Sequence, residues 1–231
     1  MNFSKIIPTV TIITFIVLSL TSCSEKKEEP NSVELTGLNT DNTANTVNTN
    51  FTSSDFPPII WIGDSLTQGS LGDDNGNENN PQAPWRVLKE ISGWNVKGYG
   101  YYGYNTHDIL WAYGEYGGIK NPEYIYIFWV GSNDFYESPA NISKVIEEID
   151  KFIANVKIDK YLVLGTTNRG DMAPDAYKSI NSEFDNKYGN NYLDIMPYIK
   201  YGPDNIHLTE ESYKEVAEAV YDKLISLYSS R

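Results

Sequence analysis

Short apolar runs alternate with amphipathic segments along most of this 231-residue chain. The apolar runs are each as long as a typical buried β-strand and lie at residues 59–62, 124–130, 161–164 and 192–195. Strands that alternate with helices are joined by right-handed crossovers, which produces a parallel sheet covered by helices on both faces. The pattern therefore predicts one α/β domain.

The predicted helices have recognisable ends. A helix over residues 84–91 has proline in its first turn. A second, over residues 138–156, has Ser138 as its N-cap and Pro139 at its first helical position. The last helix begins after Thr209 and keeps an apolar stripe nearly to the C-terminus. Sheets of this kind place their chemistry at the carboxyl ends of the strands, and the polar motifs of this chain follow predicted strands.

The first residues differ in composition from the rest. Residues 1–22 carry a positive residue, Lys5, and then an apolar run that is short for a membrane span but typical of a secretory signal peptide. The run ends in Leu20-Thr21-Ser22-Cys23, which resembles a bacterial lipobox. The resemblance implies that Cys23 is lipidated and anchors the protein in the bacterial cell envelope, outside the cytoplasm. The alternative is an uncleaved anchor in which Cys23 is incidental.

A polar segment separates Cys23 from the predicted domain. Its charged start, residues 24–29, resembles signals that send some lipoproteins to the outer surface. The remainder is rich in Asn and Thr and has no apolar period, so it cannot bury enough surface to offset the entropy of ordering. We therefore interpret residues 23–56 as a disordered tether and residues 57–231 as the folded domain.

Net charge and cysteine content exclude several classes of site. The formal net charge of -13 argues against nucleic acid as a partner, because a phosphate backbone needs clustered cations. The sole cysteine, Cys23, excludes an intrachain disulfide and a cysteine-based zinc site.

A candidate nucleophile directly follows the first predicted strand. The tripeptide Gly63-Asp64-Ser65 places a serine hydroxyl where a helix would begin. Such a hydroxyl needs a base before it can attack a substrate, and the turn alone is equally typical of an ordinary helix cap. The role of Ser65 therefore depends on a base elsewhere in the chain.

That base must be one of two histidines. His207 follows Asp204 by three residues, a spacing at which the carboxylate can fold back onto the imidazole and fix its tautomer. His107 has Asp108 beside it, but adjacent helical residues do not face each other. We therefore predict His207 as the base and Asp204 as its orienting group. Asp204 could otherwise serve only as a turn residue after a Gly-Pro pair.

A candidate oxyanion donor follows the strongest predicted strand. The sequence Gly131-Ser132-Asn133-Asp134 places the Asn133 amide at the same sheet edge as Ser65. A side-chain amide there can donate to the negative charge that develops during acyl transfer. The alternative is an Asn-Asp turn that merely ends the strand.

The glycines of Gly98-x-Gly100-x-x-Gly103 match a dinucleotide-binding fingerprint. That fingerprint opens the first strand–helix unit and is followed by an acidic residue at the tip of the next strand. Here the glycines follow a possible second strand that precedes the apolar run at 124–130, and the next strand ends at Gly131 with no acidic residue at its tip. A dinucleotide-dependent oxidoreductase is therefore the weaker hypothesis. The other is that Gly103 brings its backbone N–H close to an oxyanion.

Taken in order, four motifs resemble the sequence blocks of the SGNH hydrolases, also called GDSL-like lipases and esterases: Gly63-Asp64-Ser65, Gly103, Gly131-x-Asn133-Asp134 and Asp204-x-x-His207. The resemblance covers nearly all of residues 58–231. It implies a three-layer α/β/α flavodoxin-like fold whose five-stranded parallel sheet has the order 2-1-3-4-5. It also implies a serine esterase that uses no metal and no cofactor.

The same resemblance implies roles for individual residues. The backbone N–H groups of Ser65 and Gly103 and the side chain of Asn133 would form the oxyanion hole, with Gly100 as the alternative to Gly103. The Tyr-rich surround of Gly103 departs from many family members, which makes substrate analogy unsafe.

The substrate is suggested by aromatic residues between positions 99 and 116. Such rings can stack on sugar faces, which favours an O-acetylated carbohydrate, or they can simply pack the core. Hydrolysis of a lysophospholipid or thioester, and a non-catalytic glycan-binding lipoprotein, are the alternatives. The polar loop at residues 69–82 is expected to line the site. We interpret the triplet Arg169-Gly170-Asp171 as a chance match to an adhesion motif.

Overall fold

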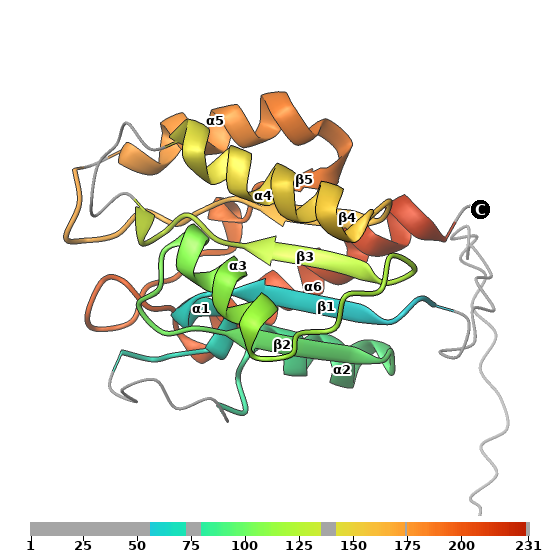
Figure 1. Cartoon of the computed structure of the whole chain (residues 1–231). Coiled ribbons are helices and arrows are strands. Elements are labelled where there is room, and N and C mark those ends of the chain that lie inside the picture. Colours follow the sequence, from blue (N-terminus) through green and yellow to red (C-terminus); the bar gives the residue numbers. More distant parts are fainter. Residues whose placement is uncertain (1–55, 73–79, 135–141, 174, 230–231) are drawn as a thin grey trace, which may run out of the picture. The chain divides into compact units, whose positions relative to one another are not determined.

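A computed structural model describes residues 56–72, 80–134, 142–173 and 175–229 (Figure 1). The predictions of a signal peptide and of lipidation at Cys23 lie outside these residues, as do the predicted helix-capping roles of Ser138 and Pro139. The predicted tether also lies outside them except for its last residue, Phe56, which is buried in the domain and stacks on Trp94 with 3.8 Å between the ring centroids.

The described domain is built around one parallel sheet. Its strands are β1 (Ile59–Gly63), β2 (Val96–Gly100), β3 (Ile125–Trp129), β4 (Tyr161–Leu164) and β5 (Tyr192–Leu193). Their order is β2-β1-β3-β4-β5, and every neighbouring pair is parallel. The order implied by the SGNH resemblance is therefore confirmed.

The last strand is shorter than the sequence pattern predicts. The apolar run continues to Ile195, but β5 ends at Leu193. The Asp194 side chain accepts a hydrogen bond from the Met196 N–H at 3.0 Å, and a 3-10 turn (Met196–Tyr198) follows. A local side-chain bond to the backbone thus replaces the final strand residues.

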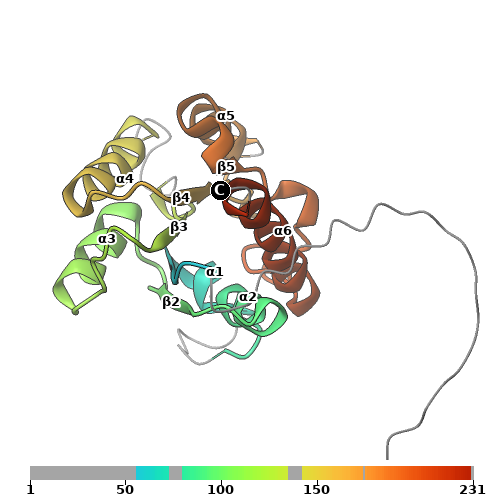
Figure 2. The same ribbon diagram turned by 90° about the vertical axis from the view of Figure 1, so that its right-hand side faces the viewer.

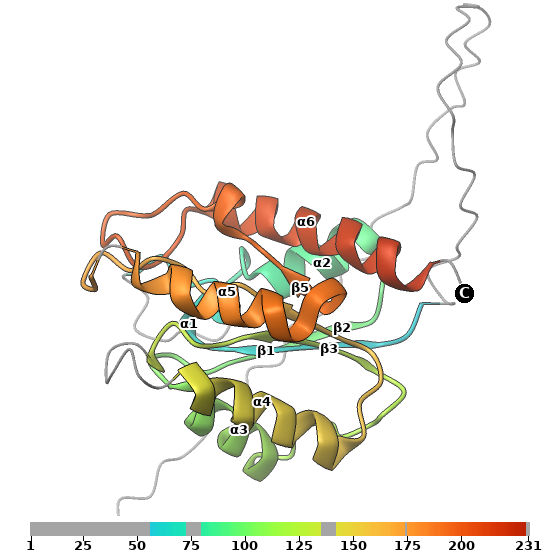
Figure 3. The same ribbon diagram turned by 90° about the horizontal axis from the view of Figure 1, so that it is seen from above.

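Helices cover both faces of the sheet (Figures 2 and 3). One face packs against α2 (Pro84–Ser92) and α6 (Glu210–Tyr228), and its core includes the side chains of Ile59 and Trp61. The other packs against α3 (Thr106–Glu115), α4 (Ile142–Val156) and α5 (Ala176–Tyr188), and its core includes Ile60 and Ile62. Alternate residues of β1 thus enter different cores, which explains why its sequence is apolar without interruption.

The predicted helix ends are confirmed where the structure describes them. Pro84 lies in the first turn of α2, and the Thr209 hydroxyl caps α6 by accepting from the Ser212 N–H at 3.2 Å. Within the described ranges, no helix is long and apolar enough to cross a membrane.

The sheet order creates a natural place for a site. The chain leaves β1 toward α2 on one face, whereas it leaves β3 toward α4 on the other face. Connections that diverge from adjacent parallel strands open a crevice at their carboxyl ends. Ser65 follows β1 and Asn133 follows β3, so the predicted nucleophile and the predicted oxyanion donor lie at the strand ends where these two connections diverge.

Candidate active site

The serine lies at the start of a short helix that directly continues β1. Ser65 is the first residue of α1 (Ser65–Gln68), and the Asp64 side chain caps this helix by accepting from the Leu66 N–H at 2.9 Å. Both side chains are buried. The cap and the preceding strand fix the position of the hydroxyl before any substrate arrives.

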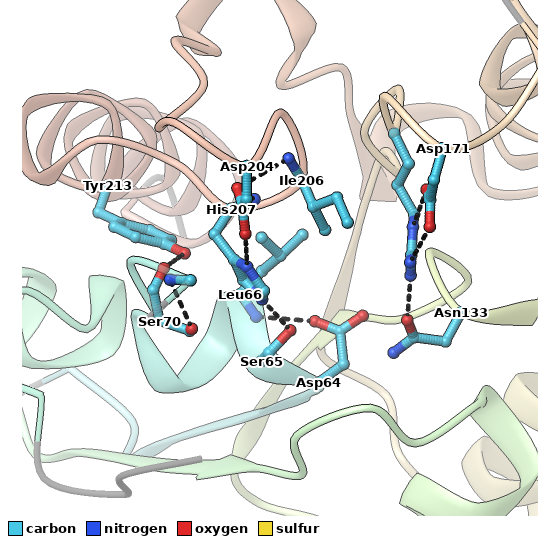
Figure 4. Close-up of polar contacts among 12 residues, drawn as sticks. Asp64, Ser65, Leu66, Ser70, Asn133, Asp171, Asp204, Ile206, His207 and Tyr213 are labelled. Atoms are coloured by element: carbon cyan, nitrogen blue, oxygen red, sulfur yellow. Dashed lines mark hydrogen bonds and ion pairs between the residues drawn. The ribbon is translucent and has the colours of Figure 1, made fainter. Parts of the chain in front are cut away.

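An unbroken hydrogen-bonded chain connects this hydroxyl to a carboxylate (Figure 4). His207 Nε2 lies 2.9 Å from Ser65 Oγ, and His207 Nδ1 lies 2.6 Å from Asp204 Oδ2. Because a carboxylate only accepts hydrogen bonds when ionised, Nδ1 carries the proton and Nε2 is left to accept from the serine. The structure therefore assembles Ser65, His207 and Asp204 in the order that serine catalysis requires.

Asp204 is held from both of its oxygens. Oδ1 accepts from the backbone N–H groups of Ile206 at 3.0 Å and His207 at 2.9 Å, while Oδ2 faces the imidazole. Burial raises the pKa of this carboxyl, but the hydrogen bonds from His207 and Ile206 outweigh that effect and leave the pKa of Asp204 below its ordinary value. Asp204 is therefore ionised at neutral pH.

The loop after α1 covers this carboxylate. A Cβ added to Gly72 would lie 2.4 Å from Asp204 Oδ2, so only glycine permits this approach. The Tyr213 hydroxyl of α6 donates to the Ser70 carbonyl at 2.6 Å and holds the same loop in place. These contacts agree with the expectation that residues 69–82 line the site, although residues 73–79 lie outside the described part.

Asp64 is an ionisable group next to the nucleophile that sequence analysis left without a role. Burial raises its pKa to about 6, although the hydrogen bond from Leu66 and the charges of His207 and Arg169 oppose that rise. A second carboxyl group thus lies within electrostatic reach of the imidazole.

His107 has a different environment from His207. It is on α3, its side chain is 68% exposed, and its Nδ1 lies 3.4 Å from Glu148 Oε2 of α4. The carboxylate partner of His107 comes from another helix, which sequence spacing did not reveal. The structure places His207, rather than His107, against Ser65.

Asn133 reaches the predicted edge, and both ends of its amide have partners. Nδ2 donates to the Tyr104 carbonyl at 2.9 Å, and Oδ1 accepts from Arg169 Nη1. The neighbouring Asp134 caps α3 instead, with Oδ2 accepting from the Thr106 N–H at 2.9 Å and from its hydroxyl at 2.7 Å. Asn133 and Asp134 therefore have different roles despite their adjacency.

Arg169 is a second site residue to which sequence reasoning gave no role. Its Nε and Nη2 form a two-point ion pair with Asp171 at 2.9 and 2.8 Å, while Nη1 contacts Asn133. These contacts give the triplet a structural role, and its interpretation as a chance match to an adhesion motif stays a prediction. The available signal was a cation in the loop after β4, at the same sheet edge as the other motifs.

The glycines of the second strand divide into two environments. Gly98 and Gly100 lie inside β2, where they pair with Trp61 and Gly63, and not in a phosphate-binding turn. The Gly100 carbonyl accepts from Gln68 Nε2 at 3.0 Å. Gly103 follows the strand and precedes Tyr104, whose carbonyl contacts Asn133. This placement removes the basis of the dinucleotide fingerprint and favours Gly103 over Gly100 at the site.

The aromatic residues also divide between packing and the site. Tyr113 is fully buried and packs edge-on against Tyr99. Tyr102 stacks on the His207 ring with a centroid separation of 5.6 Å and an interplanar angle of 21°, and Tyr104 stacks on Tyr101 at 5.9 Å. Tyr102 and Tyr104 remain partly exposed. Tyr113 therefore packs the core, whereas the rings of Tyr102 and Tyr104 lie exposed; stacking on a sugar stays a prediction.

Among the described residues, no group of three or more His, Cys, Asp or Glu side chains is arranged to hold a metal ion.

No protein-family model and no curated protein matches the chain. Solved structures are similar in fold. A carbohydrate acetylesterase family member from Sinorhizobium meliloti is 15% identical with a TM-score of 0.57, over 75% of this chain and 100% of that chain. A lipase/acylhydrolase from Enterococcus faecalis is 15% identical with a TM-score of 0.58, over 74% and 97%. A member of the lipolytic protein G-D-S-L family from Veillonella parvula DSM 2008 is 16% identical with a TM-score of 0.53, over 75% and 99%.

At these identities the likeness concerns the fold, and it extends over the described domain and nearly the whole of each neighbour. The chain therefore has the three-layer fold of the G-D-S-L lipolytic proteins and carbohydrate acetylesterases, as its resemblance to the SGNH hydrolases predicts.

Proposed function

We propose that this protein is a serine esterase that forms an acyl-enzyme on Ser65. The observation that carries the proposal is the chain of contacts from Ser65 Oγ through both nitrogens of His207 to Asp204. A protein that only bound a ligand would have no need for a hydroxyl, an imidazole and an ionised carboxylate in this order.

In the proposed reaction, Ser65 Oγ attacks the ester carbonyl carbon while its proton moves to His207 Nε2. The tetrahedral intermediate collapses as the C–O bond to the alcohol breaks, and His207 returns the proton to the departing alkoxide. Water then attacks the acyl-enzyme with His207 again as the base, which releases the acid and restores Ser65. Asp204 stabilises the imidazolium in both steps without taking up its proton.

The oxyanion would be stabilised at the crevice between β1 and β3. We assign this role to the backbone N–H groups of Ser65 and Gly103 and to the Asn133 side chain. The contact between Asn133 and the Tyr104 carbonyl supports the assignment, because it brings the Asn133 amide next to the segment that contains Gly103. Donors fixed in advance require no reorganisation when charge develops.

We favour an O-acetyl group on a carbohydrate as the substrate. Tyr102 presents an exposed ring beside the base and Tyr104 a second exposed ring in the same segment, and such rings suit the apolar faces of sugars. The carbohydrate acetylesterase among the structural neighbours supports the same class.

Hydrolysis by the full-length protein tests this function. Acetylated xylan and p-nitrophenyl esters with acetyl, butyryl and palmitoyl groups would be compared, with Ser65→Ala as the control. Rapid release of acetate by the wild type alone is the expected result. Preference for the palmitoyl ester would instead favour the lysophospholipase or thioesterase alternative, and equal rates in both proteins would contradict the esterase function.

We also propose that Cys23 carries a lipid that anchors the protein to the cell envelope. The proposal rests on the apolar run that ends at Cys23 and on the polar segment that follows. Cys23→Ala should abolish metabolic labelling with palmitate and release or mislocalise the protein. Unchanged labelling of the variant would contradict lipidation.

A further inference from the structure

We propose that Arg169 and Asp171 form a clamp that orients the Asn133 amide, so that its N–H groups rather than its carbonyl oxygen face the reacting ester. This inference rests on the proposed esterase function and adds a positioning role that the four sequence motifs do not contain.

An asparagine amide can adopt two orientations that differ by a flip of its oxygen and nitrogen, so one of them must be specified. Its oxygen and nitrogen have nearly the same shape, so packing alone does not distinguish the two orientations. Only one orientation offers hydrogen-bond donors to an oxyanion. The reversed orientation would present a carbonyl oxygen and would repel the developing negative charge.

The partners of Asn133 specify the orientation chemically. A guanidinium has donors and no acceptor, so the group that faces Arg169 Nη1 must be the carbonyl oxygen Oδ1. At the other end a backbone carbonyl, that of Tyr104, accepts from Nδ2 at 2.9 Å. Reversal would place donor against donor and acceptor against acceptor. An amide nitrogen has two hydrogens, so one remains to donate to an oxyanion while the other binds the Tyr104 carbonyl.

Arg169 is itself held in place by a residue other than Asn133. Asp171 binds it through two parallel hydrogen bonds of 2.9 and 2.8 Å, and only 11% of the Arg169 side chain is exposed. A two-point contact of this kind holds the guanidinium plane as well as its position. The hydrogen bond from Arg169 also lowers the pKa of Asp171, which keeps the carboxylate ionised at neutral pH.

The same loop contacts the catalytic turn. The Gly170 N–H donates to the Asn205 carbonyl at 2.7 Å, and Asn205 follows Asp204 with a φ of 55°. A Cβ added to Gly170 would lie 2.6 Å from Asn205 Cβ. One tripeptide therefore bears on both sides of the site: Arg169 holds the amide, and Gly170 lies against the turn that carries Asp204 and His207.

A double-mutant cycle tests the clamp. Arg169→Met keeps an unbranched stem but removes the charge and the donors. Combined with Asn133→Ala, it measures whether the two side chains act through one interaction. We expect Arg169→Met to lower kcat by about 10- to 100-fold, less than removal of an oxyanion donor, with little change in KM. In the Asn133→Ala background it should cause no further loss.

Three further variants separate positioning from folding. Arg86→Met makes the same chemical change at a half-buried arginine that lies over the Trp85 ring at 4.4 Å and belongs to neither the triad nor the proposed oxyanion hole, so kcat should stay within about twofold. Asp171→Asn keeps the shape of its side chain and weakens the ion pair, so it should give a smaller loss than Arg169→Met. Guanidinium ion at millimolar concentration should restore part of the activity of Arg169→Gly, whereas ammonium ion should not.

The outcomes distinguish the clamp from the underlying function. Equal losses from Arg169→Met in the wild-type and Asn133→Ala backgrounds, or a rise in KM alone, would overturn the clamp even if Ser65→Ala confirmed an esterase. Absence of ester hydrolysis in the wild type would overturn the esterase function first.

Discussion

The two sides of the site are built differently. On the base side, Asp204 and His207 belong to one turn, and the carboxylate binds both the backbone and the side chain of its partner. On the amide side, Asn133 depends on Tyr104 and Arg169, which are 29 and 36 residues away. The base side is thus a local structure, whereas the amide side exists only after loops from β2, β3 and β4 have met.

This difference corresponds to two tasks: the base side transfers the proton, and the amide side stabilises the oxyanion. A proton relay needs a fixed distance between nearby groups, which a short turn supplies. An oxyanion donor must lie at a fixed position between two strands, and contacts between several loops are needed to hold it there. We therefore expect changes on the base side to abolish the reaction and changes on the amide side to slow it.

The largest effect should come from the nucleophile. Ser65→Ala removes the atom that forms the acyl-enzyme, so kcat for an acetyl ester should fall by about 10⁶-fold, as when a member of a catalytic triad is removed. Steady-state hydrolysis, with thermal unfolding as the check on folding, measures this. Residual activity within tenfold of the wild type would place the chemistry elsewhere.

The orienting carboxylate should have the next largest effect. Asp204→Asn keeps the side-chain size but can stabilise the wrong tautomer of His207, so kcat should fall by about 10⁴-fold. A loss of only a few fold would mean that Asp204 is merely a turn residue.

The amide side should show a smaller and more selective effect. Asn133→Ala should lower kcat by about 10²–10³-fold and leave KM nearly unchanged, because the lost hydrogen bond strengthens in the transition state. If KM rises while kcat is retained, Asn133 is instead a substrate contact and the contrast between the two sides weakens.

The smallest effect concerns stability. Because burial raises the pKa of Asp64 from 3.8 to about 6, the folded state favours the protonated form. The protonated Asp64 carboxyl therefore contributes fully to the free energy of unfolding below about pH 4. This contribution falls by about 2–3 kcal/mol as the pH rises through about 6.

Asp64→Asn has no such titration, so it isolates this contribution. The difference in unfolding free energy, wild type minus Asp64→Asn, should fall across this range and then stay constant. A difference that does not vary with pH would show that Asp64 keeps an ordinary pKa.

The sequence predicts the parts of this protein that depend on neighbours in the chain. All strands except β2 follow from apolar runs, and the α6 cap at Thr209 and the Asp204–His207 pair follow from short spacings. The predicted end of the last strand, at Ile195, was wrong because the Asp194 side chain accepts a hydrogen bond from the Met196 N–H and the strand ends at Leu193.

The remaining features depend on contacts between distant residues. Nothing near Arg169 indicates that it contacts Asn133, and nothing near Tyr102 indicates that its ring stacks on His207. Likewise, the partner of His107 lies on another helix. Such contacts follow from the packing of loops, which residue spacing does not encode.

The central claim is that His207 activates Ser65, and the two histidines allow a matched test. A fluorophosphonate probe reacts with an activated serine, and mass spectrometry identifies the labelled residue. The full-length wild type and His107→Ala should be labelled at Ser65 at similar rates, while His207→Ala should show almost no labelling because no base accepts the serine proton. Undiminished labelling of His207→Ala, or loss of labelling only in His107→Ala, would contradict the account.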